Sequence, residues 1–364
     1  MQAACHPRVR AKRPAPTVHP VRSPSRSWTV PWQNGAVSQE LSGARVAVIG
    51  AGVSGLTCAL RLAEAGARVR VLAAQPPPRT VSAVAAAVWY PYRAYPEELV
   101  LGWSRRSREV FDGLAQVPDS GVILRPGLEL FWGVPRPDPW WRTAVHSFRR
   151  AEPREVHAGA AGGWLFEAPV VDTGRFLPFL LRRLQDRGIT PEIASFATLE
   201  SAAGTAGGDL LVNCSGLGAR ELAPDPSLHP IRGQVVRISN PGLDRFQIAD
   251  DHPGGMAYII PRFDDVILGG TAEDGATSTD EDPATTAAIL RRCADLEPAV
   301  ASARVLEIKV GLRPGRPAIR LEAERRGSLT IIHNYGHGGA GVTLCWGCAE
   351  AVVGVCIRSL QTDS

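Results

Sequence analysis

The strongest constraint on how this chain folds is a glycine-rich turn that stands between an apolar strand and an amphipathic helix. Residues 45–49, Arg-Val-Ala-Val-Ile, form a short β-branched run that favours a strand, and the turn begins at Gly50. Apolar residues then recur at helical spacing as far as Gly66, and residues 68–72 favour a second strand. Strand, turn, helix and strand in so short a span predict a βαβ unit within a parallel sheet.

The turn has the spacing G-x-G-x-x-G. In a dinucleotide-binding turn of this spacing, Gly50 would permit the tight turn and Gly52 would let the backbone approach a pyrophosphate. Gly55 would let the helix pack closely on its strand, and the helix N-terminus would then face the phosphates. Because a strand and a helix flank the motif, we predict dinucleotide binding, with a purely structural glycine turn as the alternative.

One part of the dinucleotide fingerprint is missing. An acidic side chain at the end of the second strand, about 20 residues after the glycines, normally holds the adenosine ribose. This chain has Ala73, Ala74 and Gln75 there, and its next carboxylate is Glu97. We therefore expect the ribose to be held by Gln75, by backbone groups or by water.

The net charge of +4 is concentrated at the N-terminus. Residues 1–40 carry six basic side chains against one acid, so they hold +5 and leave −1 for the rest of the chain. A near-neutral body lacks the clustered cations that bind polyanions, so we expect no nucleic-acid partner. Residues 1–42, rich in proline, serine and arginine, are expected to be a disordered leader. No run of about 20 residues is uniformly apolar, so no membrane-spanning segment is expected.

Seven cysteines, an odd number set mostly among apolar neighbours, favour reduced buried thiols and a cytoplasmic protein over a disulfide framework. Cys345 and Cys348 form a C-x-x-C pair, but no second pair at zinc spacing accompanies them. We interpret them as part of a buried helix start and predict no metal site.

The middle of the chain mixes two patterns. Residues 210–213 favour another buried strand, whereas residues 230–271 alternate in the manner of an antiparallel sheet. One helix is expected to start after Asp172 or Thr173, to carry its apolar residues at 176–184 and to end at Gly188, and further helices are expected at residues 283–296 and 342–357. The fold class is therefore α/β with two domains: a Rossmann-like nucleotide-binding domain and an interleaved, mostly antiparallel β domain for the substrate.

The C-terminal segment is the most specific part of the sequence. A strand is expected from about residue 328 to His333. It is followed by a loop that contains Gly336, His337 and four further small residues, and then by a helix. The run from Ile331 to Ala349 resembles the signature of the D-amino-acid oxidase family. The resemblance extends over nearly all of residues 45–357 and leaves only the leader outside.

Four other segments resemble the same family. Residues 84–92 are similar to its flavin-contacting stretch, and residues 213–216 are similar to its mid-chain flavin loop. Residues 311–317 are similar to the segment with the arginine that binds the substrate carboxylate, and Tyr258 matches a tyrosine that hydrogen-bonds the same group. The resemblance implies non-covalent FAD and assigns its contacts to Gly50, Ala51, Gly52, Val53, Ser54, Gly55, Ser82, Ala86, Ala87, Val88, Ile193, Ser215, Gly216, Arg313, Gly338, Gly339, Ala340, Gly341, Val342 and Thr343.

The family also implies an activity, the oxidation of neutral D-amino acids to 2-oxo acids, ammonia and hydrogen peroxide. A hydride passes from the α-carbon to flavin N5, and dioxygen reoxidises the flavin. Arg313 would hold the substrate carboxylate with its two-pronged guanidinium, and Tyr258 would add a donor. The carbonyl of Gly339 would accept from the substrate amine, and Tyr90 completes the catalytic set. Catalysis would then be mainly positioning.

The resemblance also implies a discontinuous domain plan. In this plan the FAD-binding domain consists of three segments and the substrate-binding domain of two. The expected limits are 1–42 for the leader, 43–88, 160–222 and 308–360 for the FAD-binding domain, and 89–159 and 223–307 for the substrate-binding domain.

Some residues near the motifs have a simpler interpretation. His333 and His337 could act on a proton, but histidines at a strand end are more often structural, and we prefer that interpretation. Arg316 and Arg320 are expected to be surface or ion-paired residues. Family members often carry a second tyrosine where this chain has Gly254, so the short loop before Tyr258 is expected to be flexible and the site open to bulky substrates.

Two alternatives stay open on the sequence. Residues 213–218 and 309–313 also resemble the D-aspartate oxidase branch, which should need a second cation, for which Arg93 is available. The other alternative is a flavin-binding protein with little turnover, whereas a colourless protein that binds NAD would indicate a dehydrogenase. The expected partners are a small D-amino acid and dioxygen, and the oligomeric state is open, with a homodimer considered.

Overall fold

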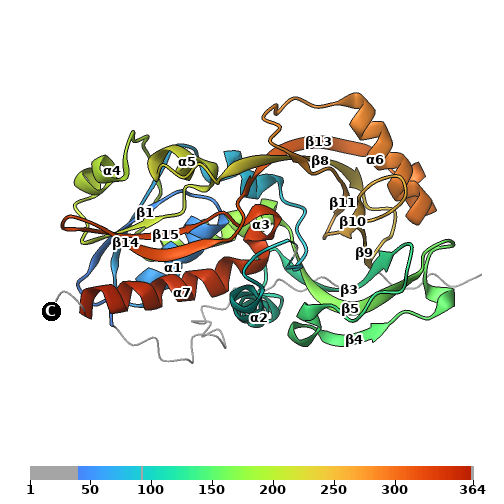
Figure 1. Cartoon of the computed structure of the whole chain (residues 1–364), viewed down its shortest axis with the longest axis horizontal. Helices are drawn as coiled ribbons and strands as arrows, with labels where there is room; N and C mark the ends of the chain where they lie inside the picture. Colours follow the sequence, from blue (N-terminus) through green and yellow to red (C-terminus); the bar gives the residue numbers. More distant parts are fainter. Residues whose placement is uncertain (1–39, 92, 362–364) are drawn as a thin grey trace, which may run out of the picture.

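The computed structural model describes residues 40–91 and 93–361, which form two β-sheets lying side by side (Figure 1). One end of the molecule holds the N-terminal strands together with α1 and α7, and the other holds the second sheet with α6 on its outside. The helices are α1 (Val53–Glu64), α2 (Glu97–Leu114), α3 (Thr173–Gln185), α4 (Leu199–Ala206), α5 (Ala219–Leu222), α6 (Pro283–Leu296) and α7 (Gly341–Gln361).

The first sheet contains the predicted βαβ unit. Its strands, in spatial order, are β14 (Arg320–Arg326), β15 (Leu329–Tyr335), β7 (Leu210–Asn213), β1 (Arg45–Ile49), β2 (Arg68–Ala73) and β6 (Glu192–Ile193). All neighbours in this sheet pair in parallel except β14 and β15, which form an antiparallel hairpin. The predicted parallel layer is therefore confirmed.

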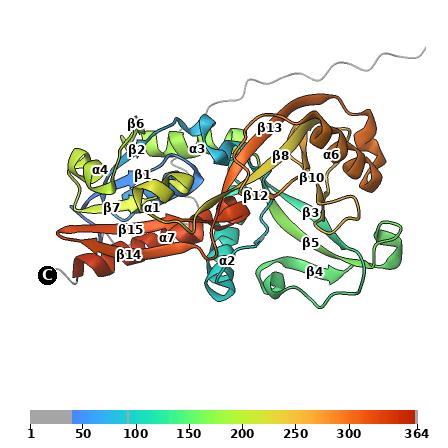
Figure 2. The ribbon, with the colours of Figure 1, turned by 45° about the horizontal axis from the view of Figure 1, so that its top comes forward.

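Helices cover both faces of the first sheet because its strands are apolar on both sides. In β1, Val46 and Val48 face the core beneath α1, α3 and α7, whereas Ala47 and Ile49 face α4 and α5. Figure 1 shows α4 above these strands and α7 beneath them, and Figure 2 shows the same sheet with its top turned forward. Because β1, β7 and β15 run parallel, their carboxyl ends lie at the same edge of the sheet. This is the edge at which a doubly wound sheet binds its ligand.

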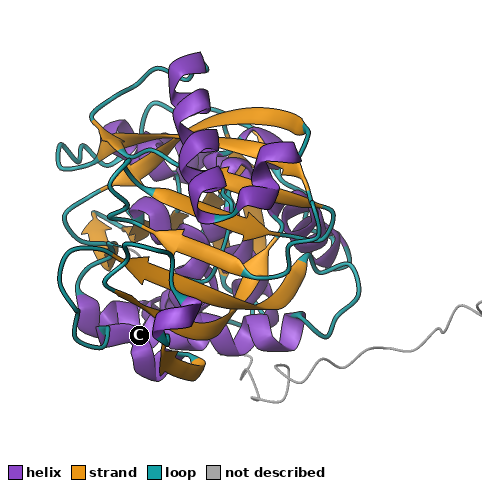
Figure 3. Ribbon diagram, turned by 90° about the vertical axis from the view of Figure 1, so that its right-hand side faces the viewer, coloured by secondary structure: helices purple, strands orange, loops and turns teal. Residues whose placement is uncertain are grey.

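The second sheet is mostly antiparallel, as predicted. Its strands, in spatial order, are β12 (Glu273–Asp274), β8 (His229–Ser239), β11 (Asp265–Gly269), β10 (Ala257–Pro261), β9 (Phe246–Ala249), β3 (Val122–Phe131), β5 (Gly162–Val171) and β4 (His146–Arg150), with β13 (Val305–Gly315) paired to β8. Only β3 and β9 run parallel among these pairs. Figure 3 shows the strands crossing the middle of the molecule with helices above and below them.

Sheet membership differs from the expected segments at two limits. β5 lies inside the segment 160–222 but pairs with β3 and β4 of the second sheet. β13 begins before residue 308 and pairs with β8 along its whole length. The expected disorder of residues 1–39 lies outside the described residues, whereas Leu41 is buried in the core and its N–H donates to Ala65.

Helix α7 differs from the expectation that no segment resembles a membrane span. Residues 338–361 are long and apolar enough by length and composition to cross a bilayer. However, 61% of the apolar window is buried within the protein, and α7 packs against α1 and α2. Cys345 and Cys348 both lie buried in this helix, as the sequence predicted.

Candidate active site

One cavity of about 910 Å³ receives residues from both sheets. Every predicted site residue lines it except Gly55, Ile193 and Ala340. Sequence positions from 50 to 343 are thereby brought to one place, and contact with a flavin stays a prediction for each of them. At the first sheet the cavity is lined largely by glycine backbone, such as that of Gly50 and Gly52. At the second sheet it is lined by larger side chains, such as those of Tyr258 and Arg313.

The three predicted residues outside the cavity wall have different positions. Gly55 packs against the turn, since a Cβ there would lie 1.9 Å from the carbonyl oxygen of Gly50, which is the packing role expected for it. Ala340 is fully buried, and Ile193 is 62% exposed on β6. Residues 194–197, which follow Ile193, line the cavity instead.

The cofactor end is built around the N-terminus of α1. Gly50 has a left-handed φ of +111°, and a Cβ there would lie 2.4 Å from the carbonyl oxygen of Cys214. The first turn of α1 holds no acidic residue, so its positive dipole end faces the cavity uncompensated. The Ser82 hydroxyl accepts from the Val53 N–H at 2.9 Å and stands beside the open backbone of Gly52. This arrangement suits an anion such as a pyrophosphate.

A second helix N-terminus faces the same cavity. Gly341, Val342 and Thr343 at the start of α7 line it, together with Gly338 and Gly339. These residues place a second set of backbone donors at the cavity wall.

Thr343 also fixes the predicted flavin-contacting stretch. Its hydroxyl donates to the Tyr90 carbonyl at 3.0 Å and accepts from the Tyr90 N–H at 3.1 Å. The residue at the start of α7 thus sets where Tyr90 stands in the cavity wall.

The two histidines are both buried and hydrogen-bonded, which favours the structural interpretation. His333 is fully buried, shares a hydrogen bond with Asn213 and lies 2.9 Å from Glu324. His337 lines the cavity, but burial lowers its pKa to about 4 and its Nε2 bonds the side chain of Asn334. His337 is therefore neutral at physiological pH.

The arginines beside Arg313 are ion-paired, as expected. Arg316 donates to Asp225 at 2.9 Å, and Arg320 donates to Glu322 and Glu324. Arg313 is different, because its guanidinium pairs with no carboxylate among residues 40–91 and 93–361 and donates to the Thr271 carbonyl instead. It is half-buried in the cavity wall, so its charge is available to an anionic ligand.

Tyr258 lies next to Arg313, and its ring packs directly against the backbone of Gly269 and Gly270. A Cβ at Gly269 or Gly270 would lie 2.0 to 2.7 Å from the Tyr258 side chain, so only glycine leaves room for the ring. Burial raises the pKa of the Tyr258 hydroxyl, and the Arg313 cation with its side-chain hydrogen bond acts in the opposite direction. Tyr258 therefore stays protonated and can donate its O–H to a ligand.

Sequence reasoning missed a buried acid beside this end of the cavity. Glu129 on β3 is 4% exposed and accepts from the Tyr90 hydroxyl at 2.9 Å. It pairs in register with Ile248, which pairs with Tyr258, so the three side chains share one sheet face. Burial raises the pKa of Glu129 to about 8, against the effect of the Tyr90 hydrogen bond. Only the strand register, which links distant residues, could have revealed it.

The loop before Tyr258 is short, as expected, and it is hydrogen-bonded to its surroundings. Asp251 accepts from the Trp132 N–H at 3.2 Å and from Arg136. Arg292 on α6 donates to the carbonyls of Met256 and Gly270. These bonds connect the loop to α6 and to the residues just after β3, and its flexibility stays a prediction.

Comparison with known proteins agrees with this geometry. A family model described as FAD dependent oxidoreductase matches residues 45–354. The chain belongs to this family. It is 56% identical over 308 residues to a D-amino-acid oxidase of Rubrobacter xylanophilus, a match that covers 84% of this chain and 94% of that protein. It is 45% identical over 311 residues to a D-amino-acid oxidase of Streptomyces coelicolor, with 84% and 94% covered.

Solved structures give the same fold. The chain superposes on glycine oxidase from Geobacillus kaustophilus with a TM-score of 0.72 at 19% identity, covering 86% of this chain and 95% of that one. As a member of the FAD dependent oxidoreductase family, the chain has a cavity whose two helix N-termini and glycine turn fit an anionic dinucleotide. Within residues 40–91 and 93–361, no group of three or more His, Cys, Asp or Glu side chains could hold a metal ion.

Proposed function

We propose that this protein is an FAD-dependent D-amino-acid oxidase that acts on neutral D-amino acids. The observation that carries the proposal is the pair of Arg313 and Tyr258 at one end of a cavity whose other end holds a dinucleotide turn. A half-buried guanidinium that no carboxylate of the described residues pairs with suits a substrate carboxylate. The two similar D-amino-acid oxidases support the same reaction.

FAD would lie non-covalently along the cavity, with its phosphates at the N-terminus of α1 and its ring toward the second sheet. Gly52, Ser54 and Ser82 would hold the phosphates, and the start of α7 would supply further N–H donors. When bound, FAD supplies the acceptor for the two electrons and the α-hydrogen that leave the substrate. Denaturation with acid should release all of the yellow colour from the protein if no covalent bond exists.

The protein's own residues would fix the substrate at three points. Arg313 binds the carboxylate, the Tyr258 O–H donates to it, and the carbonyl of Gly339, an exposed residue of the cavity wall, accepts from the amine. Three fixed points around one carbon define its handedness. Tyr90, which is hydrogen-bonded to Thr343 and Glu129, would form the cavity wall beside the side chain of the substrate. His337 is neutral and already bonded, so binding and orientation carry the reaction rather than a strong base.

The charges around the side-chain end favour neutral substrates over acidic ones. Asp250 and Arg93 both line the cavity, and burial raises the pKa of Asp250 to about 6 while Arg93 opposes that effect. At neutral pH Asp250 is largely ionised and would repel a second substrate carboxylate. We therefore keep D-aspartate oxidation as the alternative, and Asp250→Asn should improve D-aspartate turnover several-fold relative to D-alanine.

Dioxygen is the proposed final oxidant and hydrogen peroxide the proposed product, in a cytoplasmic enzyme that is a monomer or a homodimer. The test is a peroxide assay of the purified yellow protein with D-alanine, D-methionine, D-phenylalanine, D-aspartate, glycine and L-alanine. We expect peroxide from the neutral D-amino acids and none from L-alanine. A yellow protein that makes no peroxide with any D-amino acid would contradict the proposal and would favour a flavin-binding protein without turnover.

A further inference from the structure

Arg313 lies across the backbone of the neighbouring strand. It is on β13, where it pairs in register with Ile231 of β8. A Cβ at Gly233, two residues further along β8, would lie 2.3 to 2.5 Å from three atoms of the Arg313 guanidinium. The φ of Gly233 is not in the left-handed region, so its backbone does not require glycine. Glycine is required at this position because the Arg313 guanidinium occupies the space that a side chain would need.

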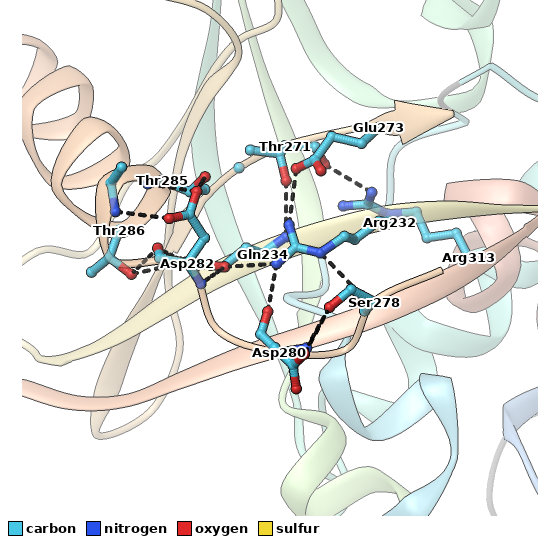
Figure 4. A network of polar contacts seen from close by, with 12 residues as sticks. Arg232, Gln234, Thr271, Glu273, Ser278, Asp280, Asp282, Thr285, Thr286 and Arg313 are labelled. Atoms are coloured by element: carbon cyan, nitrogen blue, oxygen red, sulfur yellow. Dashed lines mark hydrogen bonds and ion pairs between the residues drawn. The ribbon is translucent and has the colours of Figure 1, made fainter. Parts of the chain in front are cut away.

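Thr271 is a second residue that holds the same guanidinium. Its carbonyl accepts from Arg313 Nη1 at 2.9 Å. Its hydroxyl accepts from the backbone N–H of Gln234 at 3.0 Å, which ties this residue to β8 (Figure 4). Thr271 therefore connects the strand that carries Gly233 to the arginine that lies over it.

A buried network on β8 fixes the segment that follows Thr271. Arg232 is 5% exposed and donates to the carbonyls of Ser278 and Asp280 as well as to Glu273. Gln234 is fully buried, accepts from the Asp282 N–H at 2.9 Å and donates to the Asp282 carbonyl at 2.9 Å. Figure 4 shows these contacts converging from the segment on Arg232 and Gln234, with Arg313 alongside. The Thr271 carbonyl is therefore a rigid acceptor.

We propose that Gly233 and Thr271 are positioning residues that fix the Arg313 guanidinium for bidentate binding of the substrate carboxylate. The inference rests on the proposed function, in which Arg313 binds that carboxylate. A guanidinium has a planar fork of donors, so its rotation decides whether two N–H groups or one can face a carboxylate. The Thr271 carbonyl engages one edge of the group and Gly233 sets the plane on which it lies.

The two residues can be tested separately. In Gly233→Ala the methyl group would meet the far end of a flexible side chain, so Arg313 should move while the fold remains. In Thr271→Val the Gln234 N–H loses its acceptor, whereas Thr271→Ser keeps the hydroxyl. Gly204→Ala on α4 is the control, because a Cβ there meets nothing within 4 Å.

The measurements are kcat and KM for D-alanine and for D-alaninamide, which lacks the carboxylate, and the affinity for benzoate followed by flavin absorbance. We expect Gly233→Ala and Thr271→Val to raise the KM for D-alanine and the Kd for benzoate by about 10- to 100-fold, as for a displacement of about 1 Å. Turnover of D-alaninamide, FAD affinity and the melting temperature should change little. Thr271→Ser should recover most of the benzoate affinity, and Gly204→Ala should match the wild type.

The failures are distinguishable. If the wild type oxidises D-alanine but both variants keep its KM and its benzoate affinity, the positioning role is wrong and the proposed function stands. Equal losses with D-alanine and D-alaninamide would indicate general damage and would also overturn the inference. If the wild type oxidises no D-amino acid, the proposed function fails, and benzoate binding to the variants still decides the role of Gly233 and Thr271. Should Gly233→Ala not fold, the Thr271 pair decides alone.

Discussion

The two ends of the cavity use glycine for opposite purposes. At the first sheet, Gly50 and Gly52 expose backbone to a ligand, and the wall there is formed by a contiguous turn and a helix N-terminus. At the second sheet, Gly233 and Gly269 make room for the protein's own side chains, Arg313 and Tyr258. The exposure of backbone at the first sheet can be inferred from residues that are adjacent in the sequence. The space for side chains at the second sheet depends on which strands pair. Substitutions at one end of the cavity should therefore leave the function of the other end largely unchanged.

The largest expected effect is at the substrate end. Arg313→Leu removes the cation proposed to bind the substrate carboxylate, which typically costs about 2 to 5 kcal/mol. We expect kcat/KM for D-alanine to fall by about three orders of magnitude, a loss of roughly 4 kcal/mol. FAD affinity, measured by quenching of flavin fluorescence, should change by less than about threefold, because the proposed phosphate site lies at the other end of the cavity.

The matched control is Arg45→Leu, since Arg45 is 59% exposed in an ion pair with Asp209 and lies outside the cavity wall. Exposed pairs of this kind contribute about 1 kcal/mol or less to stability, so activity should be unchanged. Unaltered KM and kcat in Arg313→Leu would show that the substrate carboxylate binds elsewhere.

A smaller effect is expected at the cofactor end. Gly52→Ala adds a Cβ that would lie 3.1 Å from Ser82 Oγ, a tight but tolerable contact, and the φ of Gly52 is not left-handed. The fold should therefore survive. A methyl group where the backbone approaches the pyrophosphate should weaken FAD binding by about 10- to 100-fold, or roughly 1.4 to 2.8 kcal/mol.

Gly50→Ala is the informative comparison for that prediction. It combines a φ of +111° with a Cβ 2.4 Å from the Cys214 carbonyl oxygen, so it should lower the melting temperature as well as FAD affinity. Calorimetry and FAD titration of both variants distinguish the two roles. If Gly52→Ala binds FAD like the wild type, the pyrophosphate does not approach this backbone.

The two ends also differ in buried charge, which gives a pH-dependent prediction. Burial raises the pKa of Glu129 to about 8 in the folded protein, from an ordinary value of 4.5. Asp250, Asp251 and Arg136 are the charged groups that act on it, and Tyr90 donates to it. Between these pKa values the folded state binds the extra proton, so the contribution of Glu129 to stability is lost as pH rises toward and through 8.

Glu129→Gln removes this titration while keeping an acceptor for Tyr90. We expect the melting temperature of the variant, relative to the wild type, to increase by a few degrees between pH 6 and pH 9, consistent with about 1 kcal/mol or more. Asp264→Asn, which alters a largely exposed acid, serves as the control for general charge effects. A constant difference across this range would mean that Glu129 titrates near its ordinary pKa.

The difference between the two ends also explains what the sequence could predict. Gly50 to Gly55 follow β1 directly and precede α1 directly, so local spacing alone predicted the turn and the parallel sheet. The strand at 210–213, the antiparallel pattern over 230–271 and the helix at 283–296 were likewise visible from residue pattern, and the structure confirms them. Arg313 and Tyr258 were singled out through family resemblance, not through spacing.

What the sequence could not predict depends on register. Gly233 matters because β13 pairs with β8, and Glu129 matters because β3 pairs in parallel with β9. No local pattern links these partners, so a glycine in one strand gives no sign of the arginine that fills its space. For the same reason β5 was expected in the FAD-binding segments and β13 was divided by the limit at residue 308, whereas both strands pair within the second sheet.

The smallest expected effect concerns the adenosine ribose at the cofactor end. Gln75 follows β2, lines the cavity and stands where dinucleotide-binding proteins often carry an acid. Gln75→Glu should strengthen FAD binding by about two- to tenfold, as for one added hydrogen bond of roughly 0.5 to 1.5 kcal/mol. Gln75→Ala should weaken FAD binding by a similar factor. The kcat for D-alanine at saturating FAD should be the same in both variants, since Gln75 is at the end of the cavity away from Arg313. If neither substitution alters the FAD affinity, the ribose is held by backbone groups or water, and the missing acid has no side-chain substitute in this chain.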